Sequence, residues 1–281
     1  MQVLQSIEAL KAFRENLGTQ SVGLVPTMGA LHKGHMSLIH QSCAQNTHTI
    51  VSIFVNPTQF GANEDLSTYP RTLEQDLALC ESLGVSGVFV PSIEEMYPSA
   101  DELTILPPKM MGYVLEGFDR PTHFGGVLQV VLKLFMLVRP HKAYFGKKDA
   151  QQVLIVQKML RDWHLPLEVV ACPIVRDDDG LAFSSRNVYL SPQERAQALC
   201  IPQTIQCIES AISQGVYEVQ ELHKLVHKTL DSSKSLVPMH IFYAYFCDYN
   251  LAPIEKICKG ESLFLLAVRV GKTRLLDNLW C

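Results

Sequence analysis

The sequence lacks the cysteine patterns of a disulfide framework and of a zinc ribbon. None of its eight cysteines forms a CxxC pair, and most of them lie in apolar segments. Residues 1–18 also lack the basic start and apolar centre of a signal peptide. In a 281-residue chain this combination favours reduced, mostly buried thiols, and we expect a cytoplasmic protein.

Long apolar runs and basic blocks are missing as well. The longest apolar candidate, 127–138, is interrupted by Gln129 and Lys133 and is shorter than the roughly 18 residues of a membrane span. The chain carries 24 Lys and Arg against 28 Asp and Glu, for a net charge of −4. Neither nucleic acid nor an anionic membrane is therefore expected as a partner.

Two common nucleotide-binding fingerprints are absent after the first predicted strand. There is no GxGxxG and no GxxxxGK[ST], which argues against NAD-linked chemistry and P-loop hydrolysis. A zinc site at His32 and His35 is disfavoured, because no other residue stands at a spacing that completes it. His223 and His227 stand four apart on a predicted helix, and we interpret them as a solvated face.

The chain does contain short apolar runs that alternate with helical patterns. The runs predict strands at 21–25, 49–55, 87–90, 143–145 and 167–175. Helices are predicted at 35–46, 72–84 and 149–163, the second opening with a capping box of Thr72 and Gln75. This order predicts an α/β fold, a Rossmann-like doubly wound parallel sheet with helices on both faces.

The pattern changes after Asn187. Ser191, Pro192 and Glu194 have the spacing of a helix N-cap with a capping box, and Pro202 should kink or divide the helix that follows. A second helix is predicted over 217–230, then strands at 241–249 and 262–270 and a short third strand at 273–278. We therefore expect a Rossmann-like domain over 1–183 and a smaller α+β domain over 184–281.

Polar clusters follow four of the predicted strands. They read PTMGALHKGH, NPTQFG, GKKDAQQ and RDDDGLAFSSRN, and the DDDG within the last is typical of a solvated turn. Ligands of open parallel sheets bind beyond the carboxyl ends of the strands, so the four clusters should converge on one crevice.

The first cluster has the composition of a phosphate site. Glycine lets backbone amides approach a phosphate closely, and a helix that begins near Gly34 and His35 favours an anion at its N-terminus. His32 and His35 can donate hydrogen bonds to phosphate oxygens. The alternative is a glycine turn with two solvated histidines.

Taken together, PTMGALHKGH, VNPTQFG, YPRT, RPTHFGGV, YFGKKDAQQ, DGLAFSSRNVYLS and TRLLDN resemble the pantothenate synthetase (pantoate–β-alanine ligase) family over nearly the whole chain. The HxGH element is shared with a wider nucleotidyltransferase superfamily. The resemblance implies that pantoate attacks the α-phosphorus of ATP to give pantoyl adenylate and pyrophosphate. β-Alanine then attacks the adenylate to give pantothenate and AMP.

The resemblance also implies the site residues. His35, His32, Lys148 and Arg186 are the implied catalytic residues. The ATP set is Met28, Gly29, Ala30, Leu31, His32, Lys33, Gly34, His35, Gly146, Lys147, Lys148, Asp149, Val175, Phe183, Ser184, Ser185 and Arg186. The pantoate and β-alanine set is Gln59, Gln152 and Asn56, with Gln151 as the alternative to Gln152. Phe183 departs from the Met that is usual in the family.

Further expectations concern metal and assembly. Mg²⁺ should accompany ATP, with Asp76 as a candidate ligand and an exposed helical Asp as the alternative. Arg120 and His123 are expected near the pantoate or the dimer side, and the family resemblance implies a homodimer through the larger domain.

Two other functions compete with the ligase. One is a related HxGH enzyme that activates another carboxylic acid or acts on tRNA, for which the net charge gives no support. The other is a non-catalytic nucleotide-binding protein, which should carry damage in HxGH or SSR, yet both elements are intact.

Overall fold

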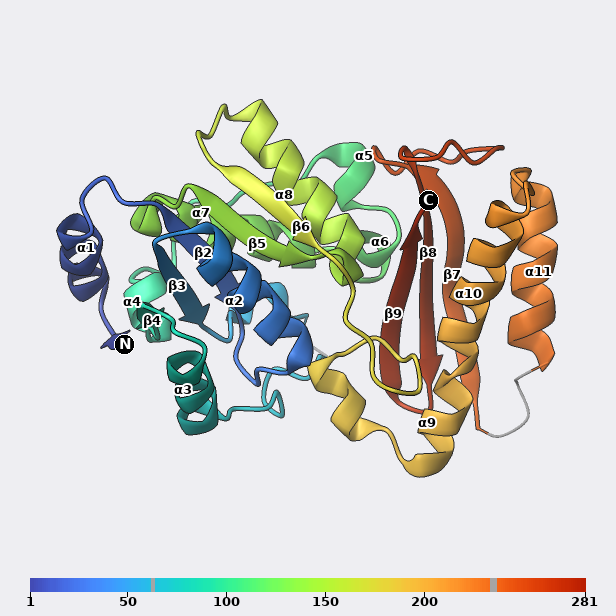
Figure 1. Cartoon of the computed structure of the whole chain (residues 1–281), viewed down its shortest axis with the longest axis horizontal. Helices are drawn as coiled ribbons and strands as arrows, with labels where there is room; N and C mark the ends of the chain where they lie inside the picture. The colour runs from blue at the N-terminus through green and yellow to red at the C-terminus, as the bar shows by residue number, and fades with distance from the viewer. Residues whose placement is uncertain (62–63, 233–236) are drawn as a thin grey trace. The chain divides into compact units, whose positions relative to one another are not determined.

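The computed structural model describes residues 1–61, 64–232 and 237–281 (Figure 1). The chain divides into two compact units. Unit 1 comprises 1–147 and 155–173, and unit 2 comprises 148–154 and 174–281. The chain passes for the last time from unit 1 to unit 2 between Pro173 and Ile174, whereas the domain boundary after Phe183 stays a prediction.

Unit 1 is built on a six-stranded parallel sheet in the order β1-β4-β3-β2-β5-β6. The strands are β1 (Gln2–Leu4), β2 (Val22–Thr27), β3 (His48–Ile53), β4 (Gly87–Phe89), β5 (Lys142–Gly146) and β6 (Glu168–Cys172). The predicted Rossmann-like parallel sheet is thereby confirmed. The chain winds from β2 toward β3 and β4, then returns to β5 and β6 on the other side of β2. The topological switch point therefore lies between β2 and β5, where such sheets bind ligands.

Helices flank this sheet. They are α1 (Ile7–Asn16), α2 (Lys33–Gln45), α3 (Leu73–Ser82), α4 (Ile93–Met96), α5 (Lys109–Gly112), α6 (Glu116–Asp119), α7 (His123–Val138) and α8 (Ala150–Asp162). Short 3₁₀ turns, η1 (Pro57–Gln59) and η2 (Lys147–Asp149), follow β3 and β5. One core cluster packs Ile39 of α2 against Val25, Val51, Val88 and Tyr144 of the strands. These strands are nearly continuous apolar runs because both faces of a parallel sheet are covered.

Unit 2 contains a three-stranded antiparallel sheet in the order β7-β8-β9. Its elements are η3 (Ser185–Tyr189), α9 (Pro192–Ala198), α10 (Cys200–Ser213), α11 (Val219–Ser232), β7 (Met239–Asp248), β8 (Ser262–Val270) and β9 (Thr273–Trp280). α10 and α11 lie beside one another and pack on the sheet, with Ile208, Leu222, Phe246 and Phe264 in a shared core (Figure 1). The predicted α+β character of this part is confirmed.

Local helix signals near the start of unit 2 are confirmed in detail. The Ser191 hydroxyl accepts the Glu194 N–H, and the Glu194 carboxylate accepts the Ser191 N–H, so the capping box is formed. Pro202 lies in the first turn of α10, where it cannot donate to the carbonyl of Ala198. The helix divides at Leu199, between α9 and α10, as predicted.

Two predictions of local structure were wrong. Thr72 is the N-cap of α3, but its hydroxyl accepts no capping hydrogen bond; it donates to Asp76. The last parallel strand ends at Cys172, just before Pro173, so Val175 lies beyond the strand. β1, at the start of the chain, was not predicted, because it depends on pairing with the distant β4. In the ranges that the structure describes, no helix has the length and apolarity of a membrane span.

The predicted burial of the cysteines holds for four of the eight, namely Cys80, Cys172, Cys200 and Cys247. All eight cysteines are free thiols, and only Cys258 is exposed. Burial raises the pKa of the Cys80 thiol to about 12, with a further contribution from the nearby Asp76 charge. Burial raises the pKa of Cys172 to about 11. These two thiols are packing groups at neutral pH.

Candidate active site

The turn after β2 brings backbone amides to the end of the sheet. Gly29 has φ +82° and Ala30 has φ +50°, so two consecutive residues adopt the left-handed region. Glycine adopts it freely, whereas alanine does so at a steric cost that surrounding contacts must offset. The Thr27 hydroxyl donates to the Ser52 carbonyl at 2.7 Å and accepts the Gly29 N–H at 3.2 Å. The turn is therefore tied to β3 at its first residue.

Asp76 supplies the contacts at Ala30. Its Oδ2 accepts the Ala30 N–H at 2.9 Å, and its Oδ1 accepts the Leu31 N–H at 2.8 Å. The Thr72 hydroxyl donates to the same Oδ1 at 3.2 Å. The Asp76 side chain is buried, so the alternative of an exposed helical Asp is wrong. The carboxylate of α3 thus fixes the backbone of the turn that leads into α2.

His32 and His35 form a reciprocal cap at the start of α2. His32 is the N-cap, and its Nδ1 accepts the Gly34 N–H at 3.1 Å. The Nδ1 of His35 accepts the His32 N–H at 3.4 Å, and the two ring centroids are 4.0 Å apart. Because each Nδ1 acts as an acceptor, each neutral imidazole carries its proton on Nε2. α2 therefore begins with two imidazole donors beside the amides of a helix N-terminus, an arrangement suited to phosphate.

A second group of site residues follows β3. Asn56 is fully buried, and its Nδ2 donates to the Gln59 Oε1 at 3.0 Å and to the Gly126 carbonyl at 3.2 Å. α7 approaches η1 so closely that a Cβ at Gly126 would lie 2.2 Å from the Thr58 carbonyl oxygen. Asn56 therefore contacts other protein groups, and its NH₂ holds the side-chain oxygen of Gln59.

Arg120 and His123 lie next to Gln59, on its backbone side. The Arg120 Nη2 donates to the Gln59 carbonyl at 3.3 Å, and the His123 Nδ1 lies 2.9 Å from the same oxygen. Arg120 also pairs with Glu64, with Nε to Oε1 at 2.8 Å. Burial alone would raise the pKa of Glu64, but the hydrogen bond and charge of Arg120 hold it below its usual value.

The segment after β5 carries the third cluster of predicted residues. Gly146 and Lys147 are the last residues of the first segment of unit 1 and are partly exposed. In unit 2, the Lys148 Nζ lies 3.2 Å from the Asp149 Oδ1, and the Asn278 Nδ2 donates to the Lys148 carbonyl at 2.7 Å. At the start of α8, Gln151 is buried whereas Gln152 is partly exposed. The choice of Gln152 over Gln151 as the pantoate residue stays a prediction.

The fourth cluster is a hairpin in unit 2. The Phe183 N–H donates to the Val175 carbonyl at 3.0 Å, and Arg176 pairs with Ala182 in a β-bridge. The predicted turn at 177–180 is confirmed, with Gly180 N–H donating to the Asp177 carbonyl at 2.8 Å. Two carboxylates of this turn also form ion pairs, because Arg195 contacts both Asp177 and Asp179.

The phosphate signature that follows is a capped turn. Ser184 is the N-cap of η3, and its hydroxyl accepts the Arg186 N–H at 3.3 Å. Ser185 and Arg186 are the first two residues of η3 and are partly exposed. Within unit 2, the hairpin therefore places Val175, Phe183 and the SSR sequence on one continuous segment.

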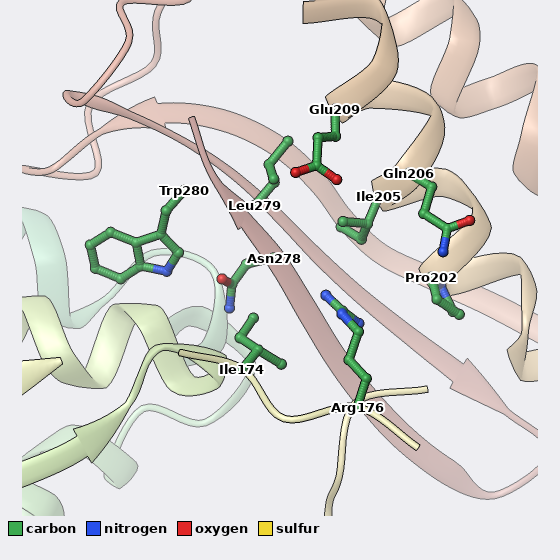
Figure 2. Close-up of a pocket in the computed structure, with 9 residues that line it drawn as sticks. All are labelled: Ile174, Arg176, Pro202, Ile205, Gln206, Glu209, Asn278, Leu279 and Trp280. Atoms are coloured by element: carbon green, nitrogen blue, oxygen red, sulfur yellow. The ribbon is translucent and has the colours of Figure 1, made fainter. Parts of the chain in front are cut away.

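Unit 2 also contains a pocket with a volume of about 330 Å³ (Figure 2). Its lining comprises Ile174, Arg176, Pro202, Ile205, Gln206, Glu209, Asn278, Leu279 and Trp280. The Arg176 guanidinium is held in a bidentate pair with Asp277, at 2.6 and 3.0 Å, and donates to the Gly180 carbonyl. This pair joins the hairpin to β9 and was not visible in the sequence.

His223 and His227 do not form a metal site with other described residues. Their ring centroids are 6.4 Å apart, and His223 packs edge-on against Phe246 at 5.0 Å. Burial and the neighbouring His227 lower the pKa of His223. In the part of the chain that the structure describes, no three His, Cys, Asp or Glu side chains gather in a way that holds a metal. His223 was predicted to be solvated, but in the structure its ring packs against Phe246.

The Rossmann-like parallel sheet and the turn after β2 are typical of a nucleotide-binding protein. The sequence model of the Pantoate-beta-alanine ligase family matches residues 2–280. The chain therefore belongs to the pantoate–β-alanine ligase family, whose members are ATP-dependent ligases.

Relatives and solved structures agree with this assignment. Pantothenate synthetases of Helicobacter pylori strain Shi470 and of Wolinella succinogenes are 54% and 50% identical, each over 100% of both chains. A pantothenate synthetase structure from Thermus thermophilus has a TM-score of 0.91 at 39% identity, covering 100% of this chain and 99% of that one. The Francisella tularensis ligase, solved with β-γ ATP and β-alanine, has a TM-score of 0.82 at 35% identity, covering 100% and 97%.

Proposed function

We propose that the protein condenses pantoate with β-alanine through a pantoyl-adenylate intermediate. A pantoate carboxylate oxygen attacks the α-phosphorus of ATP, and pyrophosphate leaves. The β-alanine amine then attacks the acyl carbon, the bond between that carbon and the phosphate oxygen breaks, and AMP leaves. A carboxylate is a poor acyl donor, and the adenylate gives it a good leaving group.

The observation that carries this proposal is the reciprocal cap of His32 and His35 on the first turn of α2. Two anions must meet in the first step, so the site needs donors fixed before charge develops. The Nε2 donors of both imidazoles and the amides of the helix N-terminus meet that need. We assign these groups to the phosphates of ATP, with Met28 to His35 lining the nucleotide.

The remaining assignments follow the two units. In unit 1 we assign Gln59 to pantoate, with Asn56 acting through it, and Gly146 and Lys147 to the nucleotide. In unit 2 we assign Lys148, Ser184, Ser185 and Arg186 to phosphates, Asp149 to the ribose, Val175 and Phe183 to the adenine side, and Gln152 to pantoate. Arg186 has a planar fork of donors that matches phosphate oxygens.

Mg²⁺ is proposed to accompany ATP in its usual role of neutralising phosphate charge. The contacts of Asp76 suit a different task. Both of its oxygens already accept hydrogen bonds, from Ala30, Leu31 and Thr72, and the side chain is buried. We therefore derive no step through a metal at Asp76, and a magnesium titration of Asp76→Asn separates the two roles.

We further propose a cytoplasmic homodimer that forms through unit 1. Large apolar side chains are exposed on one of its segments, namely Leu103, Leu106, Met110, Tyr113 and Phe118. Apolar groups gathered in this way are typical of a surface that another chain covers.

The test of the proposed reaction is ATP–pyrophosphate exchange. With pantoate alone the protein should exchange labelled pyrophosphate into ATP, and added β-alanine should draw the intermediate on to pantothenate. If exchange occurs only with a different carboxylic acid, the protein is instead a related HxGH enzyme that activates that acid.

A further inference from the structure

Tyr97 lies at the end of α4, outside every set of predicted site residues. Its hydroxyl donates to the Asn56 Oδ1 at 2.8 Å. The Thr58 hydroxyl donates to the same oxygen at 3.1 Å. Because that oxygen accepts two hydroxyl donors, the amide of Asn56 has only one favourable orientation, with its NH₂ toward Gln59 and Gly126.

The orientation of Asn56 determines that of Gln59. The Asn56 NH₂ donates to the Gln59 Oε1, so the Gln59 amide turns its oxygen toward Asn56 and its Nε2 away. The Gln59 backbone carbonyl is held separately by Arg120 and His123. Gln59 is therefore fixed as a donor on the side away from Asn56, and a donor is what a carboxylate ligand requires.

Tyr97 is itself held in place. The Lys133 Nζ lies 4.4 Å from the centroid of the Tyr97 ring and pairs with Glu102 at 2.6 Å. The Phe54 ring lies 6.2 Å from the Tyr97 ring, centroid to centroid. Burial raises the pKa of Tyr97, so the phenol stays protonated and keeps its donor role at neutral pH.

We propose that Tyr97 is a positioning residue for the acid substrate, acting through Asn56 to present Gln59 as a hydrogen-bond donor. This inference rests on the proposed assignment of Gln59 to pantoate. It adds a residue that lies two hydrogen bonds away from Gln59. It also predicts which end of the Gln59 amide meets the acid.

The test is steady-state kinetics of Tyr97→Phe, which removes only the hydroxyl. A buried neutral hydrogen bond that orients a ligand changes affinity by up to about tenfold. The KM for pantoate should rise about five- to tenfold, whereas the KM for ATP should change less than about twofold. Tyr144→Phe is the matched control, because the Tyr144 hydroxyl is also partly enclosed in unit 1 but bonds Asn46 and Gln45.

A double-mutant cycle distinguishes this positioning of Gln59 by Tyr97 through Asn56, called the relay below, from a general loss of structure. In a Gln59→Met background, Tyr97→Phe should leave the pantoate KM unchanged, because the group it positions is gone. Equal effects of Tyr97→Phe with and without Gln59 would overturn the relay. If Tyr97→Phe lowers the yield of folded protein, Thr58→Val removes the other hydroxyl donor and should give the same KM split.

The single variant Gln59→Met separates the relay from the assignment beneath it. A raised pantoate KM in Gln59→Met with no change in Tyr97→Phe rejects the relay and keeps the assignment. An unchanged pantoate KM in Gln59→Met rejects the assignment of Gln59 and the relay with it.

Discussion

Asp76 accepts the backbone N–H of Ala30 at 2.9 Å, which joins α3 to a turn residue of positive φ. A carboxylate that holds two consecutive amides restrains the backbone immediately before His32. The placement of the two histidines therefore depends on a residue that is distant from them in the sequence.

Asp76→Asn should impair ATP use without changing the need for magnesium. The asparagine NH₂ would face one of the two amide N–H groups and could not accept it. Losing a charge-assisted hydrogen bond costs about 1.5–3 kcal/mol, so kcat/KM for ATP should fall roughly 10- to 100-fold. The half-saturating Mg²⁺ concentration should stay within about twofold, and Glu74→Gln, an exposed change on α3, is the control. A large rise in that concentration would instead make Asp76 a metal ligand.

His35→Ala should slow adenylate formation by on the order of 10²–10³ with the fold intact. The reason is that the variant removes a donor aimed at charge that develops on the phosphates. Pyrophosphate release in a single turnover measures this step. His40→Ala changes an exposed histidine of the same helix and should keep the normal rate. A near-normal rate in His35→Ala would remove His35 from the chemistry.

Gln59→Glu should weaken pantoate binding more than Gln59→Met does. The glutamate has the same shape but offers only acceptors, and its charge repels the pantoate carboxylate. The pantoate KM of each variant gives the comparison. A smaller effect for the glutamate would mean that Gln59 meets the acid with its oxygen, through the hydroxyl of pantoate.

The Arg120–Glu64 pair should make stability depend on acid pH. The folded-state pKa of Glu64 is lowered, so its contribution is present above about pH 4.5 and is lost as the pH falls through the folded value. The difference in Tm between the native protein and Glu64→Gln should therefore be constant near neutrality and shrink below pH 4.5. A difference that grows toward acid pH would contradict this sign.

Asp277→Asn should destabilise unit 2. Asp277 is 1% exposed as a side chain, and its removal leaves Arg176 without its bidentate partner. Breaking such a pair costs about 3 kcal/mol, which denaturant unfolding can measure. Asp178→Asn in the same hairpin is exposed and should change stability by less than about 0.5 kcal/mol.

Phe118→Asp should convert the proposed homodimer to a monomer. The substitution places a charge on one of the exposed apolar residues of unit 1. Sedimentation equilibrium gives the molar mass, and Val188→Asp, an exposed apolar site in unit 2, serves as the control. An unchanged mass for Phe118→Asp would place the interface elsewhere.

The sequence predicted features that depend on short-range chemistry. The capping box of Ser191 and Glu194 needs only residues three apart, and the division of the helix near Pro202 follows from its missing N–H. The parallel sheet follows from apolar runs that alternate with helices. The helix start at His32 to His35 could be predicted because its capping residues are contiguous in the sequence.

The features that the sequence did not predict depend on contacts between distant residues. Thr72 had the spacing of a capping residue, but in the structure its hydroxyl donates to Asp76 and accepts no capping hydrogen bond. Asp76 had the pattern of a surface position, yet it meets the turn after β2, more than forty residues earlier. Tyr97 stands between Met96 and Pro98 in a segment rich in acidic residues, and only the fold brings it to Asn56.

Oxygen labelling tests the central claim most directly. Pantoate labelled with ¹⁸O in its carboxylate should transfer one label to AMP, because the attacking oxygen stays on phosphorus when the amine displaces AMP. The isotope shift of the AMP phosphorus resonance reports the transfer. Unlabelled AMP, or label in inorganic phosphate beside ADP, would contradict the pantoyl-adenylate route.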